Sequence, residues 1–292
     1  MDFKAKLRNE KFVITGEIAP PKGTNIKSVV DKAVSIKKFV DAINVTDLQS
    51  ANMRLGSLAM SEFLLQKGIE PIYQITCRDR NRLALQSDIL SAAAFGIKNI
   101  LVLTGDDPSC GDHPNAKKVF DLNSISLLEA IHGLQKGKDM AGNMLNGTPQ
   151  FCIGAAVNPF VKSDIKKLEK KIKVGVDFIQ TQPIFDIKLF ENFMKKTNSI
   201  GKGGKKNIPI LAGIILIKSE KMALHMNKNI PGIHIPPYLI KRISLAEDKK
   251  KEAVCIAIEI MNSIKNLCQG FHIMSLGWED LIPQILVETK IR

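Results

Sequence analysis

Two carboxylates follow an apolar run in the segment 96–108, whose sequence is GIKNILVLTGDDP. The apolar residues 100–103 predict a strand that is buried on both faces. The Gly, Asp and Pro residues that come next cannot continue it. Asp106 and Asp107 therefore stand where a buried strand opens into a loop, which is the edge at which parallel α/β folds bind ligands. The alternative is that one of them only caps the next turn.

Another carboxylate, Glu17, lies inside the apolar run FVITGEIAPP at residues 12–21. Apolar surroundings favour the neutral form of a carboxyl group, and a neutral carboxyl can donate a proton near neutral pH. Glu17 is therefore a candidate general acid. The alternative is that it pairs with a lysine for structural reasons.

The remaining sequence alternates apolar runs with segments of helical periodicity, closed by glycines and polar turns. The expected strands are residues 12–19, 42–45, 69–76, 100–103, 151–157, 176–181, 208–217 and 271–274. The expected helices are 26–39, 55–66, 81–95, 124–134, 164–174, 187–195, 219–226, 236–243, 245–267 and 278–287. Residues 107–122 form a long polar loop, and GKGGKKN at 201–207 is expected to be a flexible surface loop.

Strands and helices in this order predict an α/β fold with parallel strands, specifically a (βα)8 TIM barrel. We expect one domain over residues 1–292, with extra helices before the eighth strand. A doubly wound open sheet is the alternative. The first strand is not followed by a GxGxxG motif, which argues against a dinucleotide-binding form of that fold.

In a barrel the ends of all the strands meet on one face, and here those ends are polar almost throughout. The residues concerned are Glu17, Thr46, Asp47, Gln74, Thr76, Thr104, Gly105, Asp106, Asn158, Thr181, Gln182, Lys218 and Trp278. One polar strand end is common, whereas a nearly complete ring predicts a site for a polar small molecule.

The composition narrows the class of protein. The net charge is +13, and the excess lysine lies in short clusters such as 201–206 and 249–251. With 2 Tyr and 1 Trp there is little aromatic surface among these clusters on which bases could stack, so we expect no nucleic-acid partner. The 5 cysteines are scattered without CxxC spacing, which predicts neither disulfides nor a metal site. No apolar run is long enough for a membrane helix and the N-terminus lacks a signal peptide, so we expect a cytoplasmic protein.

Five ordered segments resemble the methylenetetrahydrofolate reductase family. They are GEIAPP at 16–21, NVTDLQSAN at 44–52, PIYQITCRDRNRLALQSDIL at 71–90, NILVLTGDDP at 99–108 and TQPIFD at 181–186. The resemblance extends from about Phe12 to Trp278 and covers the catalytic barrel, leaving no room for the regulatory domain of eukaryotic members. The pattern is most similar to forms from anaerobic one-carbon metabolism.

The resemblance implies a flavoprotein that reduces 5,10-methylenetetrahydrofolate to 5-methyltetrahydrofolate by hydride transfer. It implies that Glu17 is the acid that protonates N10, that Asp106 lies beside flavin and pterin, and that Gln182 holds the pterin. Trp278 would also contact the substrate. The implied flavin-binding residues are Thr46, Gln74, Leu103, Thr104, Gly105, Asp106, Asn158, Asp164 and Lys171.

Four positions depart from the family pattern. Thr104 and Trp278 stand where arginine is frequent, Asn158 where histidine is frequent, and Glu220 where a stacking phenylalanine is expected. These departures leave both FAD and FMN open as the flavin. The reductant is NADH or, as in some related forms, a partner subunit that carries iron–sulfur and zinc centres; a homo-oligomer is also possible.

Two other functions fit parts of the sequence. One is a pterin-binding barrel that transfers a methyl group or condenses a pterin without redox chemistry. The other is a basic scaffold or nucleic-acid-binding subunit, whose binding would be sensitive to salt. Bound flavin, visible as a yellow protein, separates the reductase from both.

Overall fold

A computed structural model describes residues 1–201 and 208–292 of the chain. Within these ranges eight parallel strands form one closed barrel, in which each strand pairs with its neighbours in sequence and β1 pairs with β8. The strands are β1 (Val13–Ile18), β2 (Ala42–Val45), β3 (Pro71–Thr76), β4 (Asn99–Leu103), β5 (Cys152–Val157), β6 (Phe178–Pro183), β7 (Ile210–Ile215) and β8 (Gly270–Met274). The predicted (βα)8 barrel is therefore confirmed and the open sheet is wrong.

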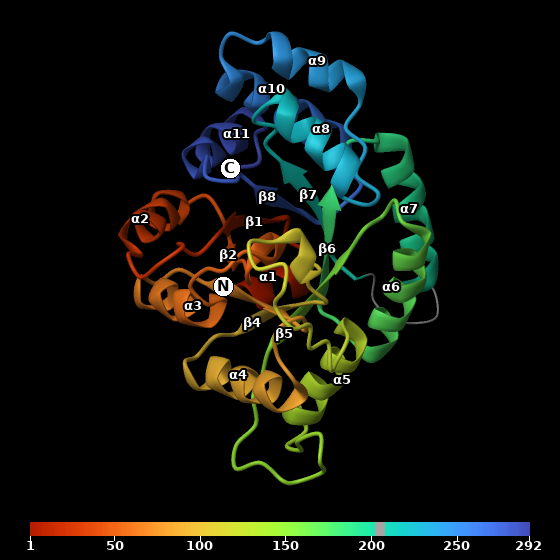
Figure 1. Cartoon of the computed structure of the whole chain (residues 1–292). Coiled ribbons are helices and arrows are strands. Elements are labelled where there is room, and N and C mark those ends of the chain that lie inside the picture. Colours follow the sequence, from red (N-terminus) through yellow and green to blue (C-terminus); the bar gives the residue numbers. More distant parts are fainter. Residues whose placement is uncertain (202–207) are drawn as a thin grey trace.

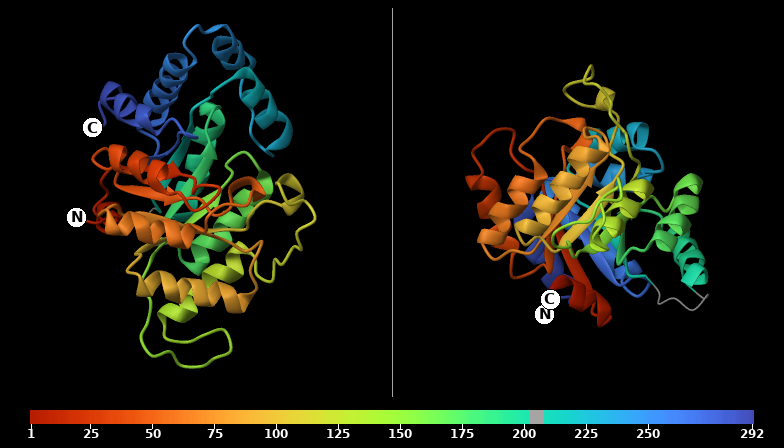
Figure 2. Two further views of the ribbon diagram at one scale, coloured as in Figure 1. Left: turned by 60° about the vertical axis from the view of Figure 1, so that its left-hand side comes forward. Right: turned by 90° about the horizontal axis from the view of Figure 1, so that it is seen from below.

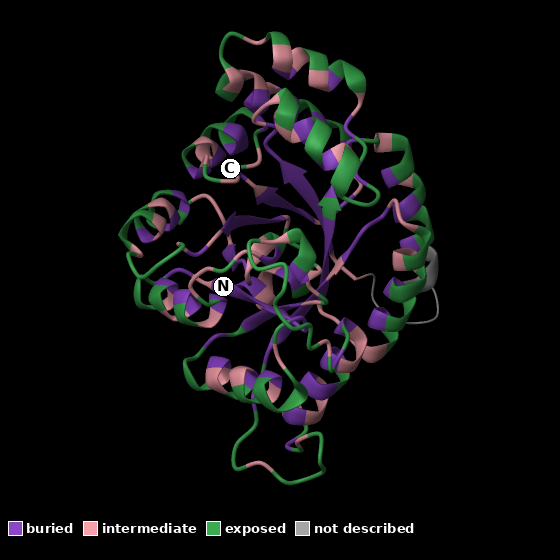
Figure 3. Ribbon diagram, in the orientation of Figure 1, coloured by how far each residue is buried: buried purple, intermediate pink, exposed green. Residues whose placement is uncertain are grey.

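Helices surround the barrel on all sides (Figure 1). They are α2 (Lys27–Ile36), α3 (Ser57–Gln66), α4 (Arg82–Ala94), α5 (Ser124–Gln135), α6 (Lys162–Val174), α7 (Ile187–Gly201), α8 (Glu220–Asn229), α9 (Pro237–Leu245), α10 (Lys249–Ile264) and α11 (Ile282–Glu288). The strands are buried and the helices are exposed on their outer sides (Figure 3). Residues 202–207, nearly all of the predicted surface loop 201–207, lie outside the described residues.

The extra helices before the eighth strand are α9 and α10, as expected. The predicted start of the longer helix at Leu245 is wrong, because Leu245 is the last residue of α9. The backbone of Ala246 is extended, and the Asp248 side chain accepts hydrogen bonds from the amides of Lys250 and Lys251. This N-cap starts a new helix at Lys249.

The lower interior of the barrel, at the N-terminal ends of the strands, is apolar. A short helix that the sequence analysis does not predict, α1 (Phe3–Arg8), closes this end with Phe3 and Leu7. Its residues pack on inward side chains of seven strands: Val13, Ala42, Ile72, Leu101, Cys152, Phe178 and Leu211. We call these seven residues, with Phe3 and Leu7, the lower layer.

The Phe178 ring of the lower layer is 0% exposed and meets the ring of Phe3 edge-on, with centroids 5.2 Å apart. It lies against the backbone of Gly154, where a Cβ atom would come within 2.3 Å of the ring. Glycine at 154 therefore makes room for the aromatic side chain, and the lower end of the barrel is a packed core.

Two residues further along the strands the interior becomes polar. Side chains alternate between the two faces of a strand, so the residues that follow the lower layer by two positions also point inward. Four of these carry polar side chains: Thr15, Asn44, Gln74 and Gln180. His272 takes the equivalent position on β8, beside Thr15, and all five residues are at least 94% buried. We call them the polar layer. The intervening residues, such as Ile14 and Ile43, belong to the apolar core between barrel and helices.

Candidate active site

Glu17 lies on the inner face of β1, one step above the polar layer, and its side chain is 10% exposed. Its oxygen Oε2 is 3.4 Å from Nε2 of His272 on β8. Its other oxygen, Oε1, accepts a hydrogen bond of 3.5 Å from Nε2 of Gln49 in the loop after β2. The alternative that Glu17 pairs with a lysine is wrong, because an imidazole and an amide face the carboxylate.

The ring of His272 connects Glu17 to the polar layer. Its Nδ1 lies 3.0 Å from Oγ1 of Thr15 and 3.3 Å from Nδ2 of Asn44. Nε2 of Gln74 donates to Oδ1 of Asn44 at 3.4 Å, and Nε2 of Gln180 donates to Oγ1 of Thr15, also at 3.4 Å. Polar side chains from β1, β2, β3, β6 and β8 thus form one buried hydrogen-bonded network under Glu17.

The two aspartates after β4 have different environments. Asp107 accepts hydrogen bonds from the amide and hydroxyl of Ser109 and pairs with Lys118 at 2.6 Å, and these contacts lower the pKa of its carboxyl to about 2. It caps the short 3₁₀ turn Pro108–Cys110. Asp106 is exposed and is not the cap. The capping role therefore belongs to Asp107, while Asp106 stays available at the rim.

Asp106 is held in place through its backbone. Arg78, which is 2% exposed, donates to the Asp106 carbonyl at 3.4 Å and to the Leu48 carbonyl at 3.3 Å. Gly105 has a φ of +92°, and a Cβ atom there would lie 3.1 Å from Cβ of Thr76 and Cβ of Arg78. A side chain at 105 would be strained and crowded. Leu103 and Thr104 precede this turn, half-buried and exposed respectively.

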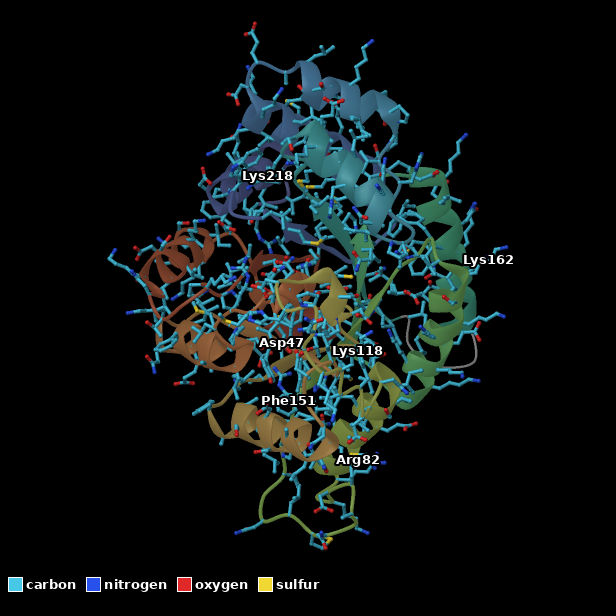
Figure 4. All side chains as sticks on the ribbon, viewed as in Figure 1. Asp47, Arg82, Lys118, Phe151, Lys162 and Lys218 are labelled. Atoms are coloured by element: carbon cyan, nitrogen blue, oxygen red, sulfur yellow. The ribbon has the colours of Figure 1, made fainter. Side chains whose placement is uncertain are left out.

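Asp47 supports the loops beside the site. Its carboxylate accepts from both terminal nitrogens of Arg80 at 2.9 Å and from the amide and hydroxyl of Thr76 at 2.8 Å. Asp47 is 3% exposed, so this bidentate pair is buried and ties the end of β2 to the end of β3. Asp47 and Thr76 are thus engaged with each other, and Asp47 is labelled near the centre of Figure 4.

Among the buried polar atoms that lack a hydrogen-bond partner in the described residues, two lie toward the C-terminal ends of barrel strands. They are Oε1 of Gln180, in a residue 2% exposed, and Oγ1 of Thr46, also 2% exposed. Buried polar groups in native proteins are rarely left unpaired. An acceptor on β6 and a hydroxyl directly after β2 suit a polar planar ligand with both donors and acceptors, such as a flavin or pterin ring.

The residues assigned to the phosphate end of a flavin lie around α6. Nζ of Lys171 donates to the Ala156 carbonyl at the end of β5 at 2.7 Å, and burial lowers the pKa of this ammonium group. Asp164, half-buried, lies 3.6 Å from Nζ of Lys167. Asn158 is 7% exposed and bridges the Pro231 carbonyl and the Phe160 amide. Lys162 of the same helix points away from the barrel (Figure 4).

The last two predicted substrate contacts come from β6 and from the segment after β8, with β7 between them. Gln182 on β6 is exposed, while Trp278 follows β8 and is half-buried. Nζ of Lys218 lies 4.7 Å from the centroid of the Trp278 ring and donates to the Leu276 carbonyl at 2.6 Å. Lys218, which follows β7, thus places its ammonium group beside the ring of Trp278.

The site predicted from the sequence lacks five residues that the structure brings together around Glu17: His272, Gln49, Thr15, Asn44 and Gln180. A signal for His272 was present, since a single histidine interrupts the apolar run of the eighth strand, FHIM. The spacing of two between Thr15 and Glu17, and between Gln180 and Gln182, was a second signal. Gln49 lies in a loop and carries no such pattern.

The described part of the chain contains no group of three or more His, Cys, Asp or Glu residues that could hold a metal ion. All five cysteines are free thiols. Among the helices described, none has the length and apolar character needed to cross a membrane.

A family model described as methylenetetrahydrofolate reductase matches residues 2–290 of the chain. The chain belongs to the methylenetetrahydrofolate reductase family. Methylenetetrahydrofolate reductase 2 of Schizosaccharomyces pombe is 26% identical over 263 residues, which cover 81% of this chain and 39% of the relative. Methylenetetrahydrofolate reductase (NADH) 1 of Arabidopsis thaliana is 27% identical over 164 residues, 54% of this chain and 27% of the relative. The barrel thus spans well under half the length of these two reductases.

Solved structures share the fold. A Clostridium thermocellum protein described as binding two copies of 5-methyl-5,6,7,8-tetrahydrofolic acid superposes with a TM-score of 0.71 at 19% identity, over 99% of each chain. An F420-dependent secondary alcohol dehydrogenase superposes with a TM-score of 0.63 at 12% identity, over 96% of this reductase-family chain and 98% of its own. At these identities the likeness concerns the barrel architecture.

Proposed function

We propose that this barrel reduces 5,10-methylenetetrahydrofolate to 5-methyltetrahydrofolate, with Glu17 as the general acid. One observation carries the proposal: in a chain of the methylenetetrahydrofolate reductase family, a nearly buried carboxyl on the inner face of β1 stands above a polar layer and faces the barrel mouth. Polar groups that converge inside a barrel at the C-terminal ends of its strands are typical of TIM-barrel active sites.

Glu17 donates its proton to N10 of the folate, which opens the five-membered ring and leaves an electron-poor carbon. General acids contribute most where they are held within reach of the atom that they protonate. His272 and Gln49 hold the Glu17 carboxyl from two sides. In this proposal Gln182 of β6 holds the pterin, and the exposed carboxylate of Asp106 after β4 orients it.

The chain's residues fit a flavin on the same face of the barrel. A bound flavin supplies the hydride. Thr46, Gln74 and the segment 103–106 would hold its ring, and Asn158, Asp164 and Lys171 would hold the phosphate end. The unpaired Oγ1 of Thr46 supports this assignment, because a ligand hydrogen bond would satisfy it. FAD is the first choice and FMN the alternative; NADH or a partner subunit with iron–sulfur and zinc centres supplies the electrons.

The deciding experiment uses the purified full chain under anaerobic conditions. The released flavin is identified, and reduction of the bound flavin by NADH is measured separately from its reoxidation by methylenetetrahydrofolate. We expect Glu17→Gln to keep flavin binding and flavin reduction and to slow the folate half-reaction by about 10²–10⁴-fold, the usual contribution of a general acid. The matched control is Glu129→Gln, which removes an exposed carboxylate of α5 and should change neither half-reaction.

Three other results would indicate a different acid, a different function or a different source of electrons. Equal folate turnover in wild type and Glu17→Gln would remove Glu17 as the acid. A colourless protein that binds folate and transfers a methyl group would indicate the pterin-binding barrel without redox chemistry. A flavoprotein that NADH does not reduce, but that an artificial one-electron donor does, would indicate a partner subunit as the source of electrons.

A further inference from the structure

His272 links the polar layer to Glu17, because its ring contacts Thr15, Asn44 and the Glu17 carboxylate. Its residue is 4% exposed, and its two ring nitrogens face different chemistry. Nδ1 faces Thr15 and Asn44, and Nε2 faces the Glu17 carboxylate 3.4 Å away. The proposed function places this ring beside Glu17 but leaves open which ring nitrogen carries the proton.

The neighbours of Nδ1 decide which nitrogen carries the proton in the neutral ring. Nδ2 of Asn44 is 3.4 Å from the Gly16 carbonyl, which can only accept, so the amide is oriented with its NH₂ group on this side. The same NH₂ group is 3.3 Å from Nδ1 of His272. Since an amide NH₂ can only donate, Nδ1 must accept. The proton of the neutral imidazole is therefore on Nε2, which points at Glu17.

A second contact agrees with this tautomer. The Thr15 hydroxyl accepts from the Gln180 amide at 3.4 Å, and its own proton has two acceptors within reach, Nδ1 of His272 at 3.0 Å and the Phe271 carbonyl at 3.5 Å. Nδ1 is the nearer of the two. The opposite end of Asn44 is also fixed, because its Oδ1 accepts from the Gln74 amide. Asn44 and Thr15 thus set the imidazole from two strands, β2 and β1.

We propose that His272 is a positioning residue for Glu17, held by Asn44 and Thr15 as the Nε2–H tautomer so that it donates a hydrogen bond to the carboxylate formed when Glu17 gives up its proton. The inference deepens the proposed function and rests on it for the role of Glu17. In the step concerned, the O–H bond of Glu17 breaks and an N–H bond forms at N10 of the folate. The electron pair stays on the carboxylate, whose two oxygens are then met by His272 and Gln49.

The need for such a donor follows from burial. A carboxylate left in a nearly closed site without hydrogen bonds is strongly disfavoured. The ionised Glu17 that remains after proton donation would therefore be high in free energy. Donors fixed in advance toward a developing charge remove this obstacle without reorganising the site. The imidazole does this while neutral and keeps its own proton.

A spectroscopic experiment tests the tautomer without reference to activity. In ¹⁵N-labelled protein the protonated and unprotonated ring nitrogens resonate far apart, and two other histidines of the chain serve as internal standards. His132 directs Nε2 at the Gly175 carbonyl at 2.6 Å, and so is an Nε2–H standard. His113 directs Nδ1 at Asp112 at 2.8 Å, and so is the opposite standard. We expect His272 to match His132, and a match to His113 would overturn the proposal.

A kinetic experiment isolates the bond to Glu17. Glutamine places its amide nitrogen near the position of Nε2, whereas asparagine reaches only the position of Nδ1. We expect His272→Gln to keep most of the folate half-reaction and His272→Asn to slow it by about 10–100-fold, less than Glu17→Gln, because the acid itself is still present. Reduction of the bound flavin should be unchanged in both. His132→Gln is the matched control on α5.

The outcomes separate this inference from the proposed function. If wild type reduces folate and both His272 variants do so at the wild-type rate, the positioning role is wrong while the reductase assignment stands. If Asn and Gln at 272 impair the reaction equally, the donor to Glu17 is not what matters and the inference also fails. If wild type binds flavin but reduces no folate, the reductase proposal fails, and the tautomer measurement still decides the contact.

Discussion

The lower layer and the polar layer of the barrel share β1, β2, β3 and β6, where their residues are two positions apart, yet they have opposite chemistry. Below, seven apolar side chains and the two residues of α1 form a packed core that includes Phe178. Above, five polar side chains form a buried network under Glu17. The left-hand view of Figure 2 shows the N-terminus and the loop after β4, in yellow, at opposite ends of the barrel.

The difference shows how one barrel separates stability from function. Each residue of the lower layer contributes apolar burial and leaves no polar group to satisfy. The polar layer contributes less to stability, because its amides and its imidazole must be desolvated and then paired. In TIM barrels the C-terminal face carries the chemistry and the N-terminal face the stability, and here the boundary lies within the barrel interior.

The largest effect is expected in the lower layer. Phe178→Ala removes a buried ring, and such substitutions lower the free energy of unfolding by about 3–5 kcal/mol. Denaturant unfolding measures the loss, and the folded fraction should keep its wild-type folate half-reaction. A variant that stays as stable as wild type, or that loses catalysis while folded, would contradict the separation of the two layers.

At the rim of the barrel mouth, we expect a substitution to change the rate of the reaction. Asp106→Asn keeps the shape of an exposed side chain and removes its charge, so we expect a slower folate half-reaction, by about tenfold or more, and a smaller change in the flavin half-reaction. Rapid-mixing absorbance of the flavin resolves both steps. Wild-type rates in both would reduce Asp106 to a turn residue, and Asp107→Asn, which removes the capping charge, is the paired comparison.

Gln180→Met tests the polar layer with a side chain of similar shape. The variant removes an acceptor that has no partner in the described structure and one hydrogen bond of 3.4 Å to Thr15. We expect the free energy of unfolding to change by less than about 1 kcal/mol, while the affinity for flavin or folate falls by about tenfold. A loss of stability as large as that of Phe178→Ala would show that this layer is part of the stabilising core.

The smallest effect is a labelling pattern in the native protein. Burial raises the pKa of the thiol of Cys77 to about 12 and of Cys268 to about 11. Both are therefore protonated and unreactive at about pH 8, since only the thiolate is alkylated. Cys152 of the lower layer is 1% exposed, and burial raises its pKa as well. Mass spectrometry should find exposed Cys110 alkylated first.

The same labelling sharpens the comparison between the layers. Cys152 lies within the lower layer, so its alkylation requires this core to open. Phe178→Ala should accelerate the labelling of Cys152, and Gln180→Met should leave it unchanged. Equal acceleration by both variants would mean that the two layers open as one unit.

Much of the fold could be predicted from the sequence because its signals are local. Apolar runs of strand length, each closed by a polar turn, indicate buried parallel strands, and their number indicates the barrel. Helix α1 was not predicted, because six residues with two apolar side chains carry too little periodicity. The start of α10 was misplaced because the local pattern continues across the Asp248 cap.

The site could be predicted in part. Glu17 stood out because a charge within an apolar strand is unusual, and the pair Asp106 and Asp107 because it ends one. Which aspartate caps the turn depends on the direction of two side chains in a 3₁₀ turn, which the sequence leaves open. The two unpaired atoms, of Thr46 and Gln180, become visible only once every neighbouring donor is placed.

The sequence alone determined that polar strand ends would gather at one mouth, since any closed parallel barrel brings them there. Only the tertiary structure decided that His272 meets Glu17, because Thr15 and His272 lie 257 positions apart in the sequence and yet within one hydrogen bond of each other. That meeting depends on β8 closing against β1 with Thr15 opposite His272. A register changed by one residue would turn the imidazole away from the interior, and this register is set by how the first and last strands pair rather than by either strand alone.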